Sequence, residues 1–147
     1  MANMTDEAAR ELLRRDKWSE GGQRFDFPSP GGHVEFAVFS RAPREAFLMD
    51  IYRARIRASK CSFQMRPASA PSVILARLDV DGGHHCNPDG SKLDGTHLHL
   101  YNERYGDREA WPVPETFTDT GDLPLTLDQF MDYCHVIVKP IFDRTLF

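Results

Sequence analysis

Four of the chain's six histidines lie within residues 78–112. His84 and His85 stand in a turn-rich loop, and His97 and His99 are two residues apart in a segment with the composition of a strand. Because side chains alternate across a strand, the imidazoles of His97 and His99 are expected on one face, beside Arg77 and Asp79. Imidazole titrates near neutral pH, binds transition metals and pairs with anions. We therefore expect any chemistry here, as acid–base work, metal binding or contact with a phosphate.

A cationic hairpin precedes the histidines. We predict two strands joined by a two-residue turn at Ala58-Ser59. This turn sets a register in which Arg53, Arg55 and Arg57 share one surface with Lys60. Like charges directly opposite each other destabilise a sheet, so an anion is expected to offset them. A phosphate can supply that charge, and so can carboxylates from the last third of the chain.

The histidine strand and the cationic hairpin together suggest metal-independent RNA cleavage, on the assumption that they share one side of the sheet. In this hypothesis His97 and His99 are the acid and the base, and Tyr101 is a second proton donor or a stacking platform for a base. Arg53 and Arg55 would stabilise charge on the phosphorus. The alternative is an ordinary solvated sheet face. Further phosphate or partner contacts are expected from the remaining cations, Arg57, Lys60, Arg66 and Arg77.

The same histidines permit a metal site. Neutral imidazoles from His97 and His99, joined by His84 or His85 and by Asp94, can supply three or four ligands to zinc or iron. The alternative is that these histidines order their loop by hydrogen bonding, with no cofactor at all. Sequence patterns of helix-borne zinc sites, EF-hands, phosphate loops and dinucleotide-binding turns do not occur.

Composition predicts one globular domain over residues 1–147. Hydrophobic residues make up 41% of the 147 positions and charged residues 27%, a balance typical of a chain that folds alone or as a homodimer. No apolar run approaches the roughly 18 residues of a membrane span, and the first residues do not resemble a signal peptide. The three cysteines are odd in number and far apart, so no disulfide framework is expected. A cytoplasmic location without membrane contact is the expectation.

Charge is distributed unevenly, although the net value is only −4. Residues 41–77 hold eight basic and two acidic side chains, whereas residues 78–147 hold five and thirteen. A local positive field can bind RNA or an acidic protein partner, while the acidic total argues against indiscriminate coating of nucleic acid. The alternative is that the basic strands pair with the acidic part of the same chain.

The order of predicted elements indicates an α+β fold. A helix begins at Thr5 and ends near Trp18, and a second opens at the capping-box pattern Thr126-x-x-Gln129 and stops by Pro140. We expect a single antiparallel sheet of about five or six strands with an N-terminal and a C-terminal helix. A flexible N-terminus of about residues 1–4 and loops of about residues 19–33 and 81–95 complete the prediction. The predicted strands are residues 34–39, 47–57, 60–66, 73–80, 96–102 and 109–113.

Two resemblances follow from the histidine-rich stretch. The run His85-x-Asn87-Pro88-Asp89-Gly90, followed by His97-x-His99-x-Tyr101-x-Glu103-x-Tyr105-Gly106-Asp107, resembles a family of small bacterial and phage proteins of unknown function. That resemblance covers roughly residues 35–137 and implies no activity. The order of Asp79, the His-His pair and His97-x-His99 is also similar to that of toxin–antitoxin toxins related to RelE-type ribonucleases. This second resemblance implies a small helix-plus-sheet ribonuclease.

Three functions are therefore open. The first is an RNA-directed, toxin-like protein of a toxin–antitoxin or mobile-element system. The second is a non-catalytic phage or mobile-element protein that inhibits a host defence or regulatory protein, with the split charge as its recognition surface. The third is a metal-binding protein built on the histidine cluster.

Overall fold

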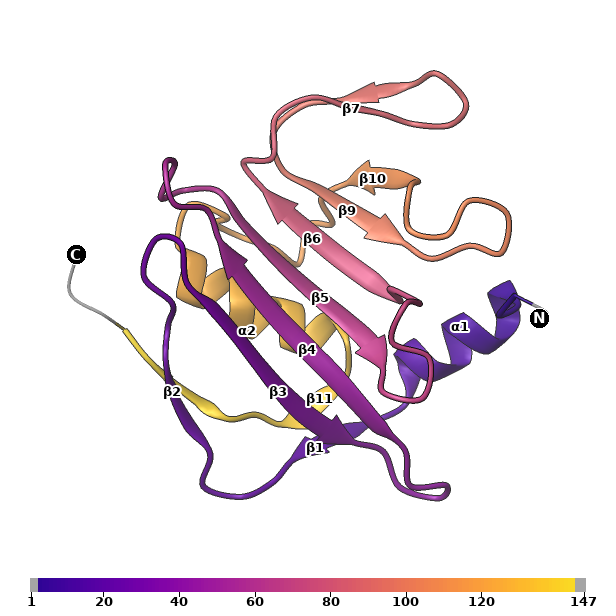
Figure 1. Ribbon diagram of the computed structural model, residues 1–147, viewed down its shortest axis with the longest axis vertical. Helices are drawn as coiled ribbons and strands as arrows, with labels where there is room; N and C mark the ends of the chain where they lie inside the picture. The colour runs from indigo at the N-terminus through magenta and orange to yellow at the C-terminus, as the bar shows by residue number, and fades with distance from the viewer. Residues whose placement is uncertain (1–2, 145–147) are drawn as a thin grey trace.

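The computed structural model describes residues 3–144 and is dominated by one large sheet (Figure 1). Neighbouring strands of this sheet are antiparallel, except that β1 and β11 pair in parallel. The predicted α+β class is confirmed, but the described part of the sheet has eight strands and is larger than the five or six expected. From one edge to the other the strands are β10 (Ala110–Pro112), β9 (His97–Leu100), β6 (Ala76–Val80), β5 (Cys61–Pro67), β4 (Ala46–Arg53), β3 (His33–Phe39), β1 (Lys17–Ser19) and β11 (Val136–Val138).

Two small sheets were not predicted, and three of their four strands lie in the stretches expected to be loops. β2 (Arg24–Asp26) pairs in parallel with β12 (Ile141–Asp143), and β7 (His85–Cys86) pairs antiparallel with β8 (Lys92–Leu93). Strands of two or three residues are too short to show an alternating pattern, so alternation cannot predict them. The β7–β8 hairpin extends from the end of the sheet near β9 and β10 (Figure 1).

The hydrophobic core lies on one side of the large sheet, where α2 (Leu123–Tyr133) crosses its face (Figure 1). Phe130 of α2 packs against Phe63 of β5 with ring centroids 6.1 Å apart. α1 (Asp6–Arg14) adds Ala9 and Leu12 to the same core. Full burial of one large apolar side chain contributes about 1.5–3 kcal/mol, so this face holds the sheet together. Along β5, β6 and β9 the opposite face carries mainly polar side chains.

Both helices end earlier than predicted. α2 ends at Tyr133, before Pro140, because Val136–Val138 joins the sheet as β11. α1 starts as expected, with the hydroxyl of Thr5 accepting from the Ala8 amide at 3.1 Å, but it ends at Arg14 because the chain near Trp18 joins the sheet as β1. Neither helix of the described chain is long and apolar enough to span a bilayer.

The second helix opens one turn earlier than the capping-box pattern predicts. Asp122 is the N-cap, and its Oδ1 accepts from the Leu125 amide at 3.1 Å. Thr126 lies inside the helix and donates to the Asp122 carbonyl at 2.7 Å, while Gln129 donates to the hydroxyl of Thr118. An aspartate followed by a proline in the first turn is itself a strong start signal, and here it prevails.

The hairpin between β4 and β5 does not turn at Ala58-Ser59. Arg53 pairs with Cys61, and residues 54–60 form a longer loop closed by a hydrogen bond from the Ala54 amide to the Lys60 carbonyl at 2.9 Å. The predicted register is therefore wrong.

Burial explains the observed register. Phe47, Met49 and Ile51 of β4 alternate onto the core face and are fully buried. Since side chains alternate with period two, Arg53 lies on that same face. Its guanidinium donates to the carbonyls of Pro28 at 3.0 Å and Ala58 at 2.9 Å, so its charge is satisfied at the margin of the core.

Candidate metal centre

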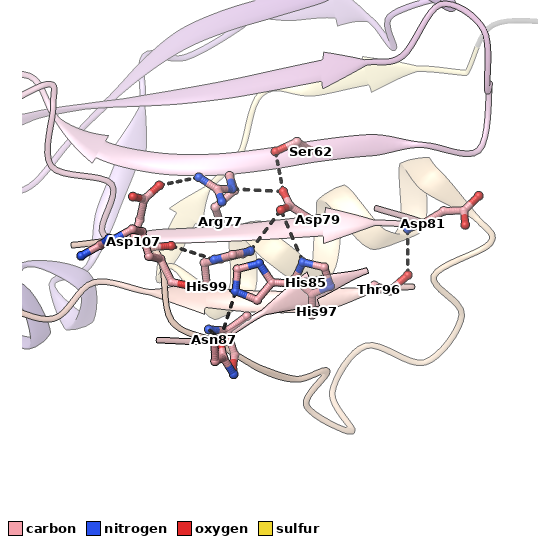
Figure 2. A network of polar contacts seen from close by, with 12 residues as sticks. Ser62, Arg77, Asp79, Asp81, His85, Asn87, Thr96, His97, His99 and Asp107 are labelled. Atoms are coloured by element: carbon pink, nitrogen blue, oxygen red, sulfur yellow. Dashed lines mark hydrogen bonds and ion pairs between the residues drawn. The ribbon is translucent and has the colours of Figure 1, made fainter. Parts of the chain in front are cut away.

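The face of the large sheet turned away from α2 carries a row of polar side chains. Cross-strand pairing places Ser62 beside Asp79, Asp79 beside His97, and Arg77 beside His99. Figure 2 shows Asp79 between Ser62 and the two histidines. The predicted alternation therefore brings the imidazoles of β9 to the same face as the charged pair of β6.

A third imidazole completes a histidine cluster, by which we mean His85, His97 and His99. His85 comes from β7, and its ring centroid lies 5.2 Å from that of His97 and 4.7 Å from that of His99. One nitrogen of each ring lies within 4.8 Å of the others. His97 and His99 are only 3% and 2% exposed, so the cluster is sheltered from water.

Asn87 holds the hairpin that carries His85. Its Oδ1 accepts from the Ala110 amide at 2.8 Å and its Nδ2 donates to the Ala110 carbonyl at 2.9 Å. The side chain thus pairs with β10 in the way a neighbouring strand would. The same Oδ1 lies 3.0 Å from Nε2 of His85, so Asn87 fixes both the hairpin and the imidazole.

Main-chain carbonyls assign the ring protons of two histidines. His99 donates through Nδ1 to the Asp107 carbonyl at 2.7 Å, and His85 donates through Nε2 to the Arg108 carbonyl at 2.8 Å. A carbonyl can only accept, so these nitrogens carry the hydrogens. In the neutral rings the remaining nitrogens, Nε2 of His99 and Nδ1 of His85, hold free lone pairs. Metal-binding histidines are anchored in this way.

The free nitrogen of His99 has no hydrogen bond. Its Nε2 lies 3.1 Å from Oδ2 of Asp79, yet the carboxylate is off the direction of the ring nitrogen, and no described residue hydrogen-bonds to it. Nδ1 of His97 is likewise buried without a partner among residues 3–144. Leaving a polar group in this condition costs about 1–3 kcal/mol. A bound cation would remove that cost for a nitrogen that faces it.

Asp79 supplies negative charge beside the cluster. Its Oδ1 accepts from the Ser62 hydroxyl and from Nε of Arg77, both at 3.1 Å. Burial alone would raise the pKa of Asp79, but the proton and charge that a protonated His99 presents to it, together with the charge of Arg77, lower it below its usual value. For His97, burial is the largest influence and lowers the pKa. At neutral pH the site therefore presents a carboxylate next to an uncharged imidazole.

Arg77 ties this carboxylate to the loop that follows β9. Its Nη1 donates to the carboxylate of Asp107 while its Nε donates to Asp79. Asp107 is also the residue whose carbonyl accepts from His99. The guanidinium of Arg77 thus positions both the carboxylate of Asp79 and the residue that anchors His99. It forms no hydrogen bond with the histidine nitrogens.

The structure separates the predicted metal ligands. His85, His97 and His99 lie together, whereas the side chain of His84 is 93% exposed and its Nδ1 contacts the carboxylate of Asp94. Both of these residues are outside the cluster.

The predicted catalytic residues are not all in one place. Arg53 lies on the core face, so the assumption that it shares a surface with His97 and His99 is wrong, for the reason of register given above. Arg55 is exposed in the hairpin loop, where its side chain approaches Gly31.

Tyr101 also leaves the histidine face. β9 ends one residue before it, its ring packs against the hydrophobic core, and its hydroxyl donates to the Met4 carbonyl at 2.9 Å. Residues 1 and 2 of the predicted flexible N-terminus lie outside the described residues, but Met4 itself packs against the core.

Several of the predicted phosphate-binding cations are paired within the chain. Arg57 donates to Asp81 at 2.9 Å, and Arg66 donates to Asp50 at 2.8 Å. With Arg77 bound to two carboxylates, the basic middle third is partly neutralised by the chain's own acids, as the intramolecular alternative proposed.

A second group of metal-type side chains lies further along the open face, formed by His33, Glu35 and Asp50. Arg66 already lies among these carboxylates, donating to Glu35 at 3.1 Å as well as to Asp50, which also accepts from Gln64 at 3.0 Å. A guanidinium in this position competes with any metal ion. We therefore assign no metal centre to this group.

Sequence reasoning missed the role of Asn87, which it treated only as part of a turn. The contact with Ala110 spans 23 positions, and no periodic pattern signals such a pairing. This contact determines that His85 rather than His84 joins the cluster, so the sequence alone could not predict which of the two histidines does so.

Comparison with known proteins supplies a family and no activity. The model of a family described as a family of unknown function (DUF6978) matches residues 4–136. None of the curated proteins matches the chain, and none of the solved structures does. The expectation of a family without an assigned function is confirmed, while the similarity to RelE-related toxins stays a prediction.

Proposed function

The chain belongs to DUF6978, a family of unknown function, and from its site we propose that it binds a transition-metal ion, of the zinc or iron type, at His85, His97 and His99. One observation carries this proposal. Two of the imidazoles are anchored through one nitrogen to main-chain carbonyls, which leaves the lone pair of the other nitrogen for the cluster.

The donor set suits such an ion. Imidazole nitrogens bind zinc, iron and copper, and three of them beside a carboxylate match the borderline-soft metals better than calcium or magnesium. Nitrogens on one tetrahedral zinc lie roughly 3.3 Å apart, since each metal–nitrogen bond is about 2.0–2.1 Å. Ring nitrogens already within 4.8 Å of one another need only small side-chain rotations to close on the ion.

Asp79 gives the centre a second feature. Its Oδ2 lies 3.1 Å from Nε2 of His99 and 3.6 Å from Nε2 of His97, and the same residue lines a cavity of about 310 Å³. A three-histidine ion leaves a position for water, and such metals activate water for hydrolysis. Asp79, held ionised by its neighbours, is placed to accept a proton on the cavity side.

Metal content of the full chain tests the proposal. Protein stripped with a chelator and titrated with Zn²⁺ or Co²⁺ is expected to bind one equivalent, and Co²⁺ should give the visible absorption of a nitrogen-ligated ion. His99→Ala should abolish this binding. His84→Ala is the matched control, because His84 adjoins the cluster in sequence and is exposed, and it should bind as the native protein does. Failure of the native protein to bind either ion, or equal binding by His99→Ala, would refute the proposal.

RNA cleavage without a metal is a second candidate, and the proximity of His97 and His99 favours it. Their ring centroids are 5.0 Å apart, with Asp79 and Arg77 beside them, which supplies two imidazoles for acid–base work and one cation for a phosphate. A toxin-like ribonuclease of this kind should cut RNA in the presence of EDTA, and His97→Ala should abolish the cutting. Intact RNA in EDTA after incubation with the native protein excludes it.

A further inference from the structure

Two adjoining hollows lie at the end of the open face beside Asp79. The first, of about 310 Å³, is lined by Tyr52, Ser62 and Asp79 among others. The second, of about 400 Å³, is lined by the hairpin loop that contains Arg55 and Arg57. They share Ala54, Lys60 and Gly82. We call them together the β4–β5 trough.

We propose that the β4–β5 trough binds the phosphoryl group of an anionic ligand and presents it to the metal ion at the histidine cluster. The inference rests on the metal-binding function proposed above for the position of the ion, but the anion site has its own evidence in charge, in the space left at Gly82 and in the shape of the hollows.

Charge provides the first argument. Lys60 and Arg55 are exposed, and no described carboxylate lies within ion-pair distance of either side chain. Arg57 is partly neutralised by Asp81, which lies 2.8 Å from its Nε. Asp79 and Asp81 also line the trough, but Arg55 and Lys60 on its outer wall keep positive charge that neither carboxylate pairs with, a condition that attracts phosphate. Lysine and arginine are the side chains that bind phosphoryl oxygens in proteins.

The space around Gly82 provides the second argument. Gly82 lines both hollows, and a Cβ there would meet the Cβ of Asp79 at 3.3 Å and Cε1 of His97 at 3.6 Å. Gly82 and Asp79 thus line the trough at the point where it adjoins His97 of the histidine cluster. A side chain at this position would crowd Asp79 and fill the space beside His97, whereas glycine leaves that space open to a ligand.

The inner wall suits the rest of a phosphorylated molecule. Tyr52 is 43% exposed and its ring stacks on His33, with centroids 4.2 Å apart and an interplanar angle of 5°. An aromatic side chain held in one orientation offers a flat contact for the group that carries the phosphate. A volume of about 310 Å³ lies at the lower end of small-molecule sites, which favours a compact phosphoester.

Anion binding by variants of the full chain tests the inference. Metal content is measured first, and then metal-loaded and chelator-treated protein are each titrated with inorganic phosphate, adenosine monophosphate and a short single-stranded RNA. Lys60→Ala and Arg55→Ala are each expected to weaken phosphate binding about tenfold, because a charged hydrogen bond is lost. Arg41→Ala is the matched control, since Arg41 lies over the ring of Trp18 at 4.1 Å and lines another cavity.

The outcomes separate the two proposals. If metal binds and Lys60→Ala leaves phosphate binding unchanged, the trough proposal is overturned and the metal centre stands. If no metal binds but phosphate binds in a manner that depends on Lys60, the trough stands without the ion. Tighter binding of the mononucleotide than of phosphate identifies a small ligand, and tighter binding of RNA alone identifies a nucleic acid. Because Lys60 and Arg55 are exposed, circular dichroism should show that both variants fold.

Discussion

Replacing Asn87 by alanine should weaken the fold and the metal centre at the same time. The side chain is 9% exposed and forms two hydrogen bonds with the main chain of Ala110, and it also donates to the hydroxyl of Ser91 at 3.1 Å. Alanine would leave one buried amide and one buried carbonyl of Ala110 unpaired. Each costs about 1–3 kcal/mol, so the free energy of unfolding should fall by about 3 kcal/mol.

The same change removes the oxygen that contacts Nε2 of His85 at 3.0 Å. Partners of this kind, which orient a ligand without touching the ion, typically contribute 10–100-fold to metal affinity. Zn²⁺ affinity of Asn87→Ala should therefore be about 10–100-fold weaker than that of the native protein. His97 and His99 lie on β9 and should keep their positions. Asn87 is a positioning residue in this account, and its effect on affinity should exceed that of any exposed change in the hairpin.

Urea unfolding of metal-free protein measures the first effect, and competitive Zn²⁺ titration measures the second. Hydrogen exchange of the Ala110 amide gives a local readout, since this amide loses its acceptor and should exchange faster. Lys92→Ala is the control, because Lys92 is exposed in the same hairpin. The reasoning would be refuted if the free energy of unfolding of Asn87→Ala lay within about 1 kcal/mol of the native value and the Ala110 amide exchanged at the native rate.

Three further predictions follow from the burial of charged and nucleophilic groups. Asp50→Ala should cost about 3 kcal/mol in urea unfolding, because the carboxylate is fully buried and its loss leaves Arg66 without its main partner; Glu35→Ala, whose side chain is 45% exposed, should cost at most about 1 kcal/mol, and equal costs would contradict the assignment. Iodoacetamide at pH 8 should label one thiol of the folded protein and three after denaturation, since burial raises the pKa of Cys61 and Cys134 to about 12 whereas Cys86 is exposed; rapid labelling of all three in the folded protein would exclude the buried placement. Burial lowers the pKa of His97, so the unfolded chain binds more protons there and the stability of metal-free protein should fall as the pH drops through the ordinary histidine pKa of about 6.5; His97→Gln should flatten this part of the pH profile, and an identical profile would show that another group is responsible.

Local patterns were sufficient for the parts of the fold that repeat over several residues. Alternation located the central strands β3, β5, β6 and β9 to within a few residues, and it put His97 and His99 on the same face as Arg77 and Asp79. Alternation works here because one face of each strand is buried, so a slip of one residue would expose the core.

Contacts between distant parts of the chain were beyond such patterns. The parallel pairing of β1 with β11 is fixed by groups such as Lys17, whose buried ammonium donates to the carbonyls of Leu13, Arg15 and Cys134 at 2.9 Å. No residue spacing in the sequence predicts that Lys17 is fully buried. The register of β4 failed for a related reason, because the prediction followed an assumed two-residue turn at Ala58-Ser59 rather than the burial of the apolar residues earlier in the strand.

The open face of the sheet contains two clusters of metal-type side chains, and the position of one guanidinium distinguishes them. At the β3–β4 end Arg66 lies between Asp50 and Glu35 and neutralises them, so an ion gains little by entering. At the β6–β9 end Arg77 is drawn to the far side of Asp79 by Asp107, and the imidazole nitrogens stay free of cationic partners. The carboxylates at the β3–β4 end are already paired with Arg66. The imidazole nitrogens at the β6–β9 end hold lone pairs that no cation among the described residues contacts. A cation at the histidine cluster would bind the free imidazole nitrogens, and an anion in the trough beside it would pair with Lys60 and Arg55.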